Sequence, residues 1–328
     1  MMPDSKEKMT MTKKQRVIAA IRKEPVDHVP SCFSLHFPEE MSFGQAAVDA
    51  HISFFRETGC DVLKIMNENL VPPIGEMNGP EDWEKVPAYT KDAPFMRAQL
   101  DMVERILERA GDDAFSVATI HGICASMIHP IEERYGYEPV RNLLCEHLRT
   151  NPGPLVSAMD RVADSMCELV VECVSRGVDG IYYAALGGEH HFFTDEEFAE
   201  YIEPYDKRIL SAVRESGAYS FLHICKENLN MQRYANYDAF ADVVNWGVYE
   251  TNYSLEEGRK LFPNTTIMGG LANRSGVLVD GTLEELEAAV HKIISDFGTR
   301  GFILGADCTL PTEISYERIM AAVKAAVI

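Results

Sequence analysis

Two short stretches far apart in the sequence carry residue types that bind a transition metal. His223 and Cys225 stand two apart at the end of one apolar run, and Cys308 follows another apolar run near the end of the chain. Side chains at positions i and i+2 of a strand point the same way, so His223 and Cys225 can contact one ion. One imidazole and two thiolates suit zinc, and three protein ligands with one open position are typical of a catalytic zinc site. The pattern therefore predicts such a site at His223, Cys225 and Cys308.

The residues alone leave a second interpretation open. An H-x-C pair also arises by chance, and buried cysteines in a reducing compartment mostly pack as small hydrophobic residues. The chain has eight cysteines at irregular spacings, which do not indicate a disulfide framework. Six of them lack a comparable metal-ligating partner, and we interpret them as packing residues: Cys32, Cys60, Cys124, Cys145, Cys167 and Cys173.

Two acidic residues stand near this predicted metal site. Glu250 follows the sixth apolar run and is a candidate fourth metal ligand of the resting protein, although a solvated loop glutamate is an equally good interpretation. Asp307 precedes Cys308 and either orients a ligand or caps a loop.

Other polar side chains end or follow apolar runs and are candidates for binding a cofactor or substrate. His36 and His121 each end such a run, where a hydrogen-bonded core role is as plausible as a functional one. His190 and His191 follow Gly187-Gly188-Glu189, a turn that we interpret as part of a flexible lid. The predicted cofactor-binding residues are His36, Asn67, Glu68, His121 and His190, with Tyr183 and His191 in comparable positions.

Eight short apolar runs are typical of strands buried on both faces. They are 31–37, 61–66, 115–121, 180–186, 219–224, 242–246, 265–269 and 301–305. Between them lie helical patterns at about 45–58, 93–110, 154–176, 195–216, 254–262 and 282–298, with a last one at about 315–327. Three of these begin with a capping-box signature: Thr194…Glu197, Ser254…Glu257 and Thr282…Glu285.

The alternation predicts an α/β fold, a (β/α)8 barrel, over a single domain of residues 1–328. A doubly wound open sheet is the competing fold, but no G-x-G-x-x-G follows the first run. Residues 69–92 are predicted to form a long loop and residues 122–150 an extra helical excursion. The first dozen residues are polar and are expected to be disordered. In a barrel, the functional groups lie at the C-terminal ends of the strands.

Composition excludes several classes of protein. Asp and Glu total 51 against 31 Lys and Arg, which gives a net charge of −20 and no basic surface for nucleic acid. The N-terminus has no apolar signal core, and the longest apolar stretch, at 155–176, is interrupted by charges. We therefore expect a cytoplasmic protein that binds neither nucleic acid nor membrane.

The H-x-C pair with its distant cysteine resembles the zinc-dependent methyltransferase branch of the uroporphyrinogen decarboxylase superfamily. Three further stretches resemble that family's motifs: 24–30 (EPVDHVP), 268–285 (MGGLANRSGVLVDGTLEE) and 301–304 (GFIL) with Cys308 and Pro311. The resemblance covers nearly the whole chain. It implies a TIM barrel, zinc at His223, Cys225 and Cys308, and methyl transfer between a corrinoid and a thiol such as coenzyme M.

The sequence contains no corrinoid-binding D-x-H-x-x-G motif, so the corrinoid (methylcobalamin as co-substrate) is expected on a separate corrinoid protein. The small-molecule methyl donor or acceptor stays open. One alternative is the methyltransferase of an O-demethylase-type system, which moves a methyl group from a methyl ether or methanol to the corrinoid. A barrel that binds a corrinoid or its carrier without catalysis is another.

A uroporphyrinogen decarboxylase-like lyase is the remaining alternative, and two departures disfavour it. The decarboxylase carries an Arg-rich loop after its first strand, whereas this chain has no Lys or Arg between Lys23 and Arg56. Cations there would be needed to hold the carboxylates of a tetrapyrrole. The decarboxylase's Phe-Ser-Asp motif is also replaced by Met66-Asn67-Glu68.

Overall fold

The computed structural model describes residues 10–327, and its centre is a ring of eight parallel strands. The strands are β1 Ser31–Cys32, β2 Val62–Ile65, β3 Phe115–His121, β4 Gly180–Ala185, β5 Tyr219–Ile224, β6 Val243–Trp246, β7 Thr266–Leu271 and β8 Phe302–Ala306. Their order is β1-β8-β7-β6-β5-β4-β3-β2. The amide of Asp61, just before β2, donates to the carbonyl of Ser31 at 3.1 Å and links the two ends of this order. The predicted (β/α)8 barrel is confirmed.

All eight predicted apolar runs contain a strand, and β1 differs most from its prediction. We expected a strand over 31–37, but regular pairing with β8 covers only Ser31 and Cys32. Further along, Leu35 pairs with Leu310 in an isolated parallel bridge, and the amide of Leu310 donates to Ser34. The segment after Cys32 therefore pairs with the loop beyond β8, since β8 itself ends at Ala306.

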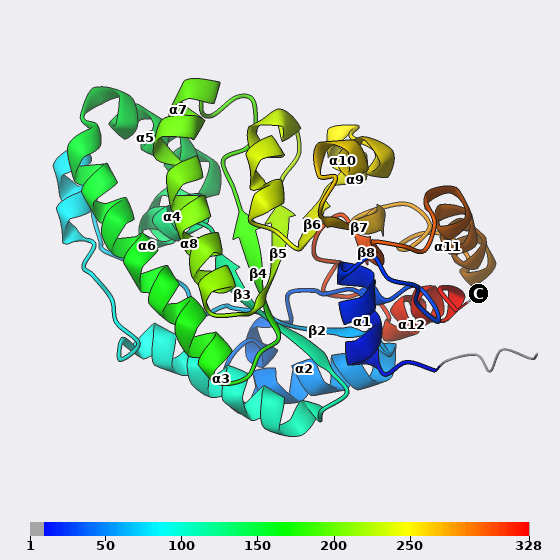
Figure 1. Cartoon of the computed structure of the whole chain (residues 1–328). Helices are drawn as coiled ribbons and strands as arrows, with labels where there is room; N and C mark the ends of the chain where they lie inside the picture. The colour runs from blue at the N-terminus through cyan, green and yellow to red at the C-terminus, as the bar shows by residue number, and fades with distance from the viewer. Residues whose placement is uncertain (1–9, 328) are drawn as a thin grey trace, which may run out of the picture.

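Helices surround the strands on the outside of the ring (Figure 1). They are α1 Lys13–Ile21, α2 Gly44–Thr58, α3 Pro94–Ala110, α4 Ile123–Tyr135, α5 Tyr137–Thr150, α6 Pro152–Ser175, α7 Asp195–Tyr201, α8 Glu203–Glu215, α9 Val248–Thr251, α10 Leu255–Leu261, α11 Leu283–Phe297 and α12 Tyr316–Ala325. The three predicted capping boxes begin α7, α10 and α11, each with both reciprocal hydrogen bonds. The excursion at 122–150 forms α4 and α5, and the loop at 69–92 contains a single 3-10 helix, Pro80–Lys85.

Several helical features differ from the sequence prediction, among them α9 and a 3-10 helix at Met231–Ala239, neither of which was predicted. The stretch expected as one helix at 195–216 is divided into α7 and α8 at Ile202, because Pro204 has no N–H to donate and its ring clashes with the preceding turn. The helix α1 was not predicted. Thr12 caps it through the amide of Gln15, and Met11 donates to Asp27. The expected disordered start otherwise falls on residues 1–9, outside the described residues.

The inside of the barrel is packed with side chains. Cys32, Val62, Phe115, Tyr182 and Phe221 lie in one buried cluster there with residues from the other strands. A filled interior leaves the ends of the strands as the places where a ligand can reach the chain. In the described part of the chain, no helix is both long and apolar enough to cross a membrane.

Candidate metal centre

Strands β5 and β8 bring together the three side chains that the sequence predicts as metal ligands. His223 lies near the end of β5, Cys225 follows the strand directly, and Cys308 lies two residues beyond the end of β8. One donor atom from each lies within 4.8 Å of the other two, and the two sulfur atoms are 3.9 Å apart. The i, i+2 spacing and the shared barrel mouth thus bring three donor atoms close enough that they could hold one metal ion.

The imidazole of His223 is held with one nitrogen available. Its Nδ1 lies 2.6 Å from Oδ1 of Asn245 on β6, while the Asn245 amide nitrogen donates to the carbonyls of Met268 and Ala306. Because that amide nitrogen already donates twice, Oδ1 must accept, and Nδ1 of His223 therefore carries the proton. Nε2 is left as a lone pair, and it is buried with no hydrogen-bond partner among the described residues. Such an orphaned acceptor fits a metal ion.

The two thiols titrate as a pair with opposite shifts. The hydrogen bond from Cys225 lowers the pKa of Cys308 well below its ordinary value, against the effect of burial, and the charge of Lys64 acts in the same direction. The same hydrogen bond and burial raise the pKa of Cys225. One proton shared between two sulfurs leaves the pair ready to lose it when a cation replaces it.

Lys64 is a charged neighbour of this pair that the sequence reasoning missed. It lies on β2, is 8% exposed, and its ammonium is 3.6 Å from the centre of the Tyr182 ring. The ring of Tyr182 in turn stacks on His223, with centroids 5.5 Å apart. A lysine in the middle of an otherwise apolar strand run was the available signal. Asn245 was also missed, and its signal was of the same kind: a polar residue within the apolar run at 242–246.

A second cluster of polar side chains lies at the mouth of the barrel and contains three of the predicted cofactor-binding residues. Nδ1 of His36 is 2.6 Å from Oε1 of Glu68, and His36 is half exposed. Burial opposes ionisation of Glu68, but the hydrogen bond and charge of His36 and the charge of Lys64 hold its pKa below the ordinary value. Burial and the neighbouring His129 lower the pKa of His121 to about 3. His36 and Glu68 therefore form a hydrogen-bonded pair, while His121 stays neutral.

Asn67 and the two acidic candidates occupy distinct positions. Asn67 is buried, and its side chain donates to the carbonyl of Thr119 on β3. Asp307 accepts from the amide of Tyr249 at the start of α9, so it caps that turn, and burial raises its pKa to about 7. Glu250 is not among the three clustered ligands, although burial and the charge of Cys308 raise its pKa.

The turn with His190 and His191 is anchored rather than free. The amide of His190 donates to the carbonyl of Asn228 at 3.1 Å, and Arg233 donates to the carbonyl of Glu189 at 3.0 Å. His191 is exposed and contacts the Asn228 side chain. These bonds argue against the expected flexible lid, because motion of the turn would break each of them.

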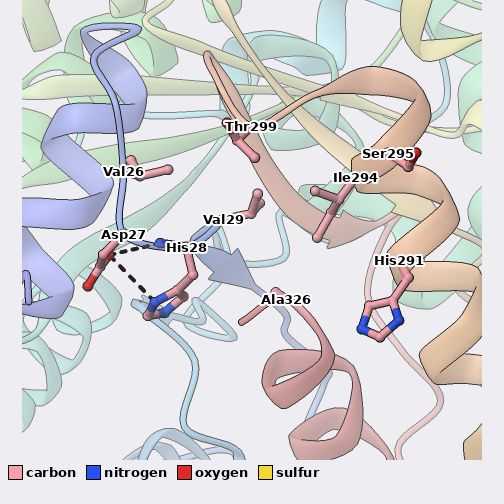
Figure 2. Close-up of a pocket in the computed structure, with 9 residues that line it drawn as sticks. All are labelled: Val26, Asp27, His28, Val29, His291, Ile294, Ser295, Thr299 and Ala326. Atoms are coloured by element: carbon pink, nitrogen blue, oxygen red, sulfur yellow. Dashed lines mark hydrogen bonds and ion pairs between the residues drawn. The ribbon is translucent and has the colours of Figure 1, made fainter. Parts of the chain in front are cut away.

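The opposite end of the barrel has a hollow of about 600 Å³, lined in part by His28, His291 and Thr299 (Figure 2). Its walls come from the segments before β1 and β8 and from α11 and the end of α12. Catalytic groups in such barrels lie at the C-terminal ends of strands. This hollow therefore lies apart from the cluster of His223, Cys225 and Cys308.

Comparison with known proteins gives the following relatives. The family model described as Uroporphyrinogen decarboxylase (URO-D) matches residues 55–327. "Methylcobamide:CoM methyltransferase MtbA" of Methanosarcina mazei is 22% identical over 325 residues, which cover 86% of this chain and 89% of that protein. A solved "methyltransferase from Methanosarcina mazei" has a TM-score of 0.76 at 17% identity and covers 97% of this chain and 98% of its own. A B12-independent methionine synthase from Shewanella sp. W3-18-1 has a TM-score of 0.59 at 10% identity and covers 92% of this chain and 97% of its own. At these identities the solved structures show the shared fold.

Proposed function

This chain belongs to the uroporphyrinogen decarboxylase family, and we propose that it is a zinc-dependent methyltransferase that moves a methyl group between a corrinoid and a thiol or another small acceptor. The observation that carries the proposal is the buried, unpartnered Nε2 of His223 beside the sulfurs of Cys225 and Cys308. The relative whose name describes methyl transfer between methylcobamide and CoM supports the class of reaction.

The residues present fit a zinc ion. His223, Cys225 and Cys308 would hold it, and they leave a fourth position for a ligand. When bound there, zinc would keep a substrate thiol in its thiolate form at neutral pH. Glu250 remains our proposed ligand for that position in the absence of substrate, supported by its half-buried place near Cys308 and His223. Thiol ligands must stay reduced to bind, which supports the proposed cytoplasmic location.

The surrounding residues have separate tasks in this proposal. Asn245 keeps His223 in the tautomer that presents Nε2. His36 and Glu68, 2.6 Å apart, would hold the proton released by an acceptor thiol. His121, Asn67 and His190 remain predicted contacts for the substrate or corrinoid; of these, His121 lies beside Glu68 and supports that role best.

The corrinoid is proposed to arrive on a separate protein. Four of the exposed large hydrophobic residues lie in the segments that follow strands β1, β2 and β6, at the end of the barrel where the metal site lies: Met41, Phe43, Leu70 and Tyr249. Apolar side chains around a mouth are typical of protein contact surfaces. They support docking of a corrinoid protein over the barrel mouth.

A decarboxylase activity is not supported by the segment that follows β1. In the structure this segment forms a 3-10 helix, Glu39–Met41, whose two glutamates are exposed. Carboxylates there would repel the acidic side chains of a tetrapyrrole. Transfer from a methyl ether or methanol to the corrinoid uses the same metal site and stays as the second candidate.

The proposal is tested by incubating the protein with methylcobalamin and a panel of thiols and following loss of the methylcobalamin spectrum. We expect thiol-dependent demethylation that falls by about 100-fold or more in Cys308→Ala, since one ligand of three is lost. Cys173→Ala, a buried cysteine on α6, is the matched control and should retain activity. A protein that binds zinc but moves no methyl group to or from any corrinoid would be a binding barrel instead.

A further inference from the structure

Lys64 is a buried cation without a carboxylate partner. Its ammonium donates to the hydroxyl of Ser34 at 3.2 Å and lies against the Tyr182 ring, and no ion pair of the described residues includes it. The buried cations Arg16 and Arg141 are different, because Arg16 pairs with Asp61 and Arg141 with Glu189. Isolated buried charges are costly, so a lysine kept in this position needs a negative charge nearby.

The negative charges that act on Lys64 come from the mouth of the barrel. Burial lowers the pKa of Lys64, and the charges that oppose this effect are those of Cys308, Cys32, Cys225 and Glu68. Cys32 is buried with its pKa raised to about 12, so it is a neutral thiol near pH 7. Cys308 and Cys225 are therefore the neighbours of Lys64 that become thiolates when they bind a metal ion.

Once a divalent cation is bound, those two thiolates are its ligands, and the cation balances their charge. One Zn²⁺ with two cysteine thiolates and a neutral imidazole has a net charge of zero. An anion in the fourth position, either a carboxylate or a substrate thiolate, makes the buried centre negative by one unit. Lys64 then restores neutrality, whereas a neutral ligand in that position would leave its charge unbalanced.

We propose that Lys64 is a positioning residue that selects an anionic fourth ligand at the metal, because it balances the extra negative charge from inside the barrel. The inference rests on the proposed zinc site. It explains why a lysine is held on β2 by Ser34 and Tyr182 without a carboxylate of its own. It also gives the mouth a preference for thiols that bind as thiolates over neutral donors of similar size.

The test uses protein loaded with Co²⁺ in place of zinc, whose absorption spectrum reports the ligands directly. Binding of 2-mercaptoethanol, which binds as an anion, is compared with binding of imidazole, which binds as a neutral molecule. In Lys64→Met we expect the affinity for the thiol to fall ~10-fold or more, with a change of less than about 2-fold for imidazole. Lys64→Arg, which retains the charge, should recover the preference for the thiol.

Lys13→Met is the matched control. Lys13 is also partly buried, donates to the carbonyls of Gly59 and Cys60, and lies over the Phe55 ring, but it is on α1 at the other end of the barrel. It should leave both affinities unchanged. Should Lys64→Met fail to bind metal, Lys64→Gln replaces it in the same comparison.

The outcomes separate this inference from the function on which it rests. Equal losses for thiol and imidazole in the Lys64 variants would assign it a packing role and overturn the inference, as would an unchanged preference for the thiol. A wild-type protein that binds no cobalt would instead overturn the metal site itself.

Discussion

Nδ1 of His223 lies 2.6 Å from Oδ1 of Asn245, and the amide of Asn245 is fixed by the carbonyls of Met268 and Ala306. Four consecutive strands of the barrel, β5 to β8, thus determine which nitrogen of one imidazole faces the two cysteines. Partners of this kind orient metal-ligating histidines and raise their basicity.

Replacing Asn245 by alanine should weaken zinc binding by ~10–100-fold without abolishing it, because the imidazole loses its fixed tautomer and orientation but keeps Nε2. Competition with a chromophoric chelator measures the change. Asn69→Ala is the control, since the Asn69 amide is partly buried and donates to Gln99 rather than to a ligand. Equal zinc affinities in the two variants would contradict the orienting role of Asn245.

Glu68→Gln should lower kcat/KM for methyl transfer by roughly 10–100-fold while zinc content stays the same, because the pair with His36 would lose its proton-holding carboxylate. Glu76→Gln, which alters a surface pair with Arg134, should have no effect. Loss of zinc from the Glu68 variant would show that Glu68 supports the metal site, contrary to the proton-holding role.

The buried carboxyl of Asp206 predicts a pH-dependent term in stability. Burial raises its pKa to about 7, although it accepts hydrogen bonds from Tyr183 and Tyr237. The folded protein therefore binds a proton that the unfolded chain releases at about pH 4, so this group's contribution to stability is full below pH 4 and falls as pH rises to 7.

The substitution Asp206→Asn removes the pH-dependent contribution of this carboxyl to the stability of the protein. Between pH 4 and pH 8 the free energy of unfolding of the wild type, relative to the variant, should fall by roughly 2–4 kcal/mol, at about 1.4 kcal/mol per pKa unit. Taking the difference cancels the titration of other groups, such as His51, whose pKa burial lowers to about 4. Urea unfolding at several pH values measures it, and a difference that is constant with pH would disprove the raised pKa of Asp206.

The sequence predicts the barrel well because each strand is a continuous apolar run and most helices have explicit start signals. The capping boxes at Thr194, Ser254 and Thr282 are local, and each one is formed. The features that the sequence did not predict depend on tertiary pairing. The end of β1 depends on which part of the β8 segment lies beside it, and the break at Ile202 depends on Pro204.

Part of the site could also be predicted, because it too depends on local sequence spacing. The i, i+2 rule places His223 and Cys225 together from local geometry, and closure of the barrel adds Cys308. Lys64 and Asn245 could not be assigned roles from spacing, because their importance lies in what they contact from other strands. A polar residue inside a buried run signals a partner but does not identify it.

The metal site itself is tested most directly by the zinc content of the purified protein, measured by elemental analysis for wild type, Cys308→Ala and Cys124→Ala. The account predicts about one zinc per chain in the wild type and in Cys124→Ala, whose cysteine is a packing residue, and little or none in Cys308→Ala. A wild type that binds no zinc when zinc is supplied, or a Cys308→Ala variant that keeps a full equivalent, would contradict it.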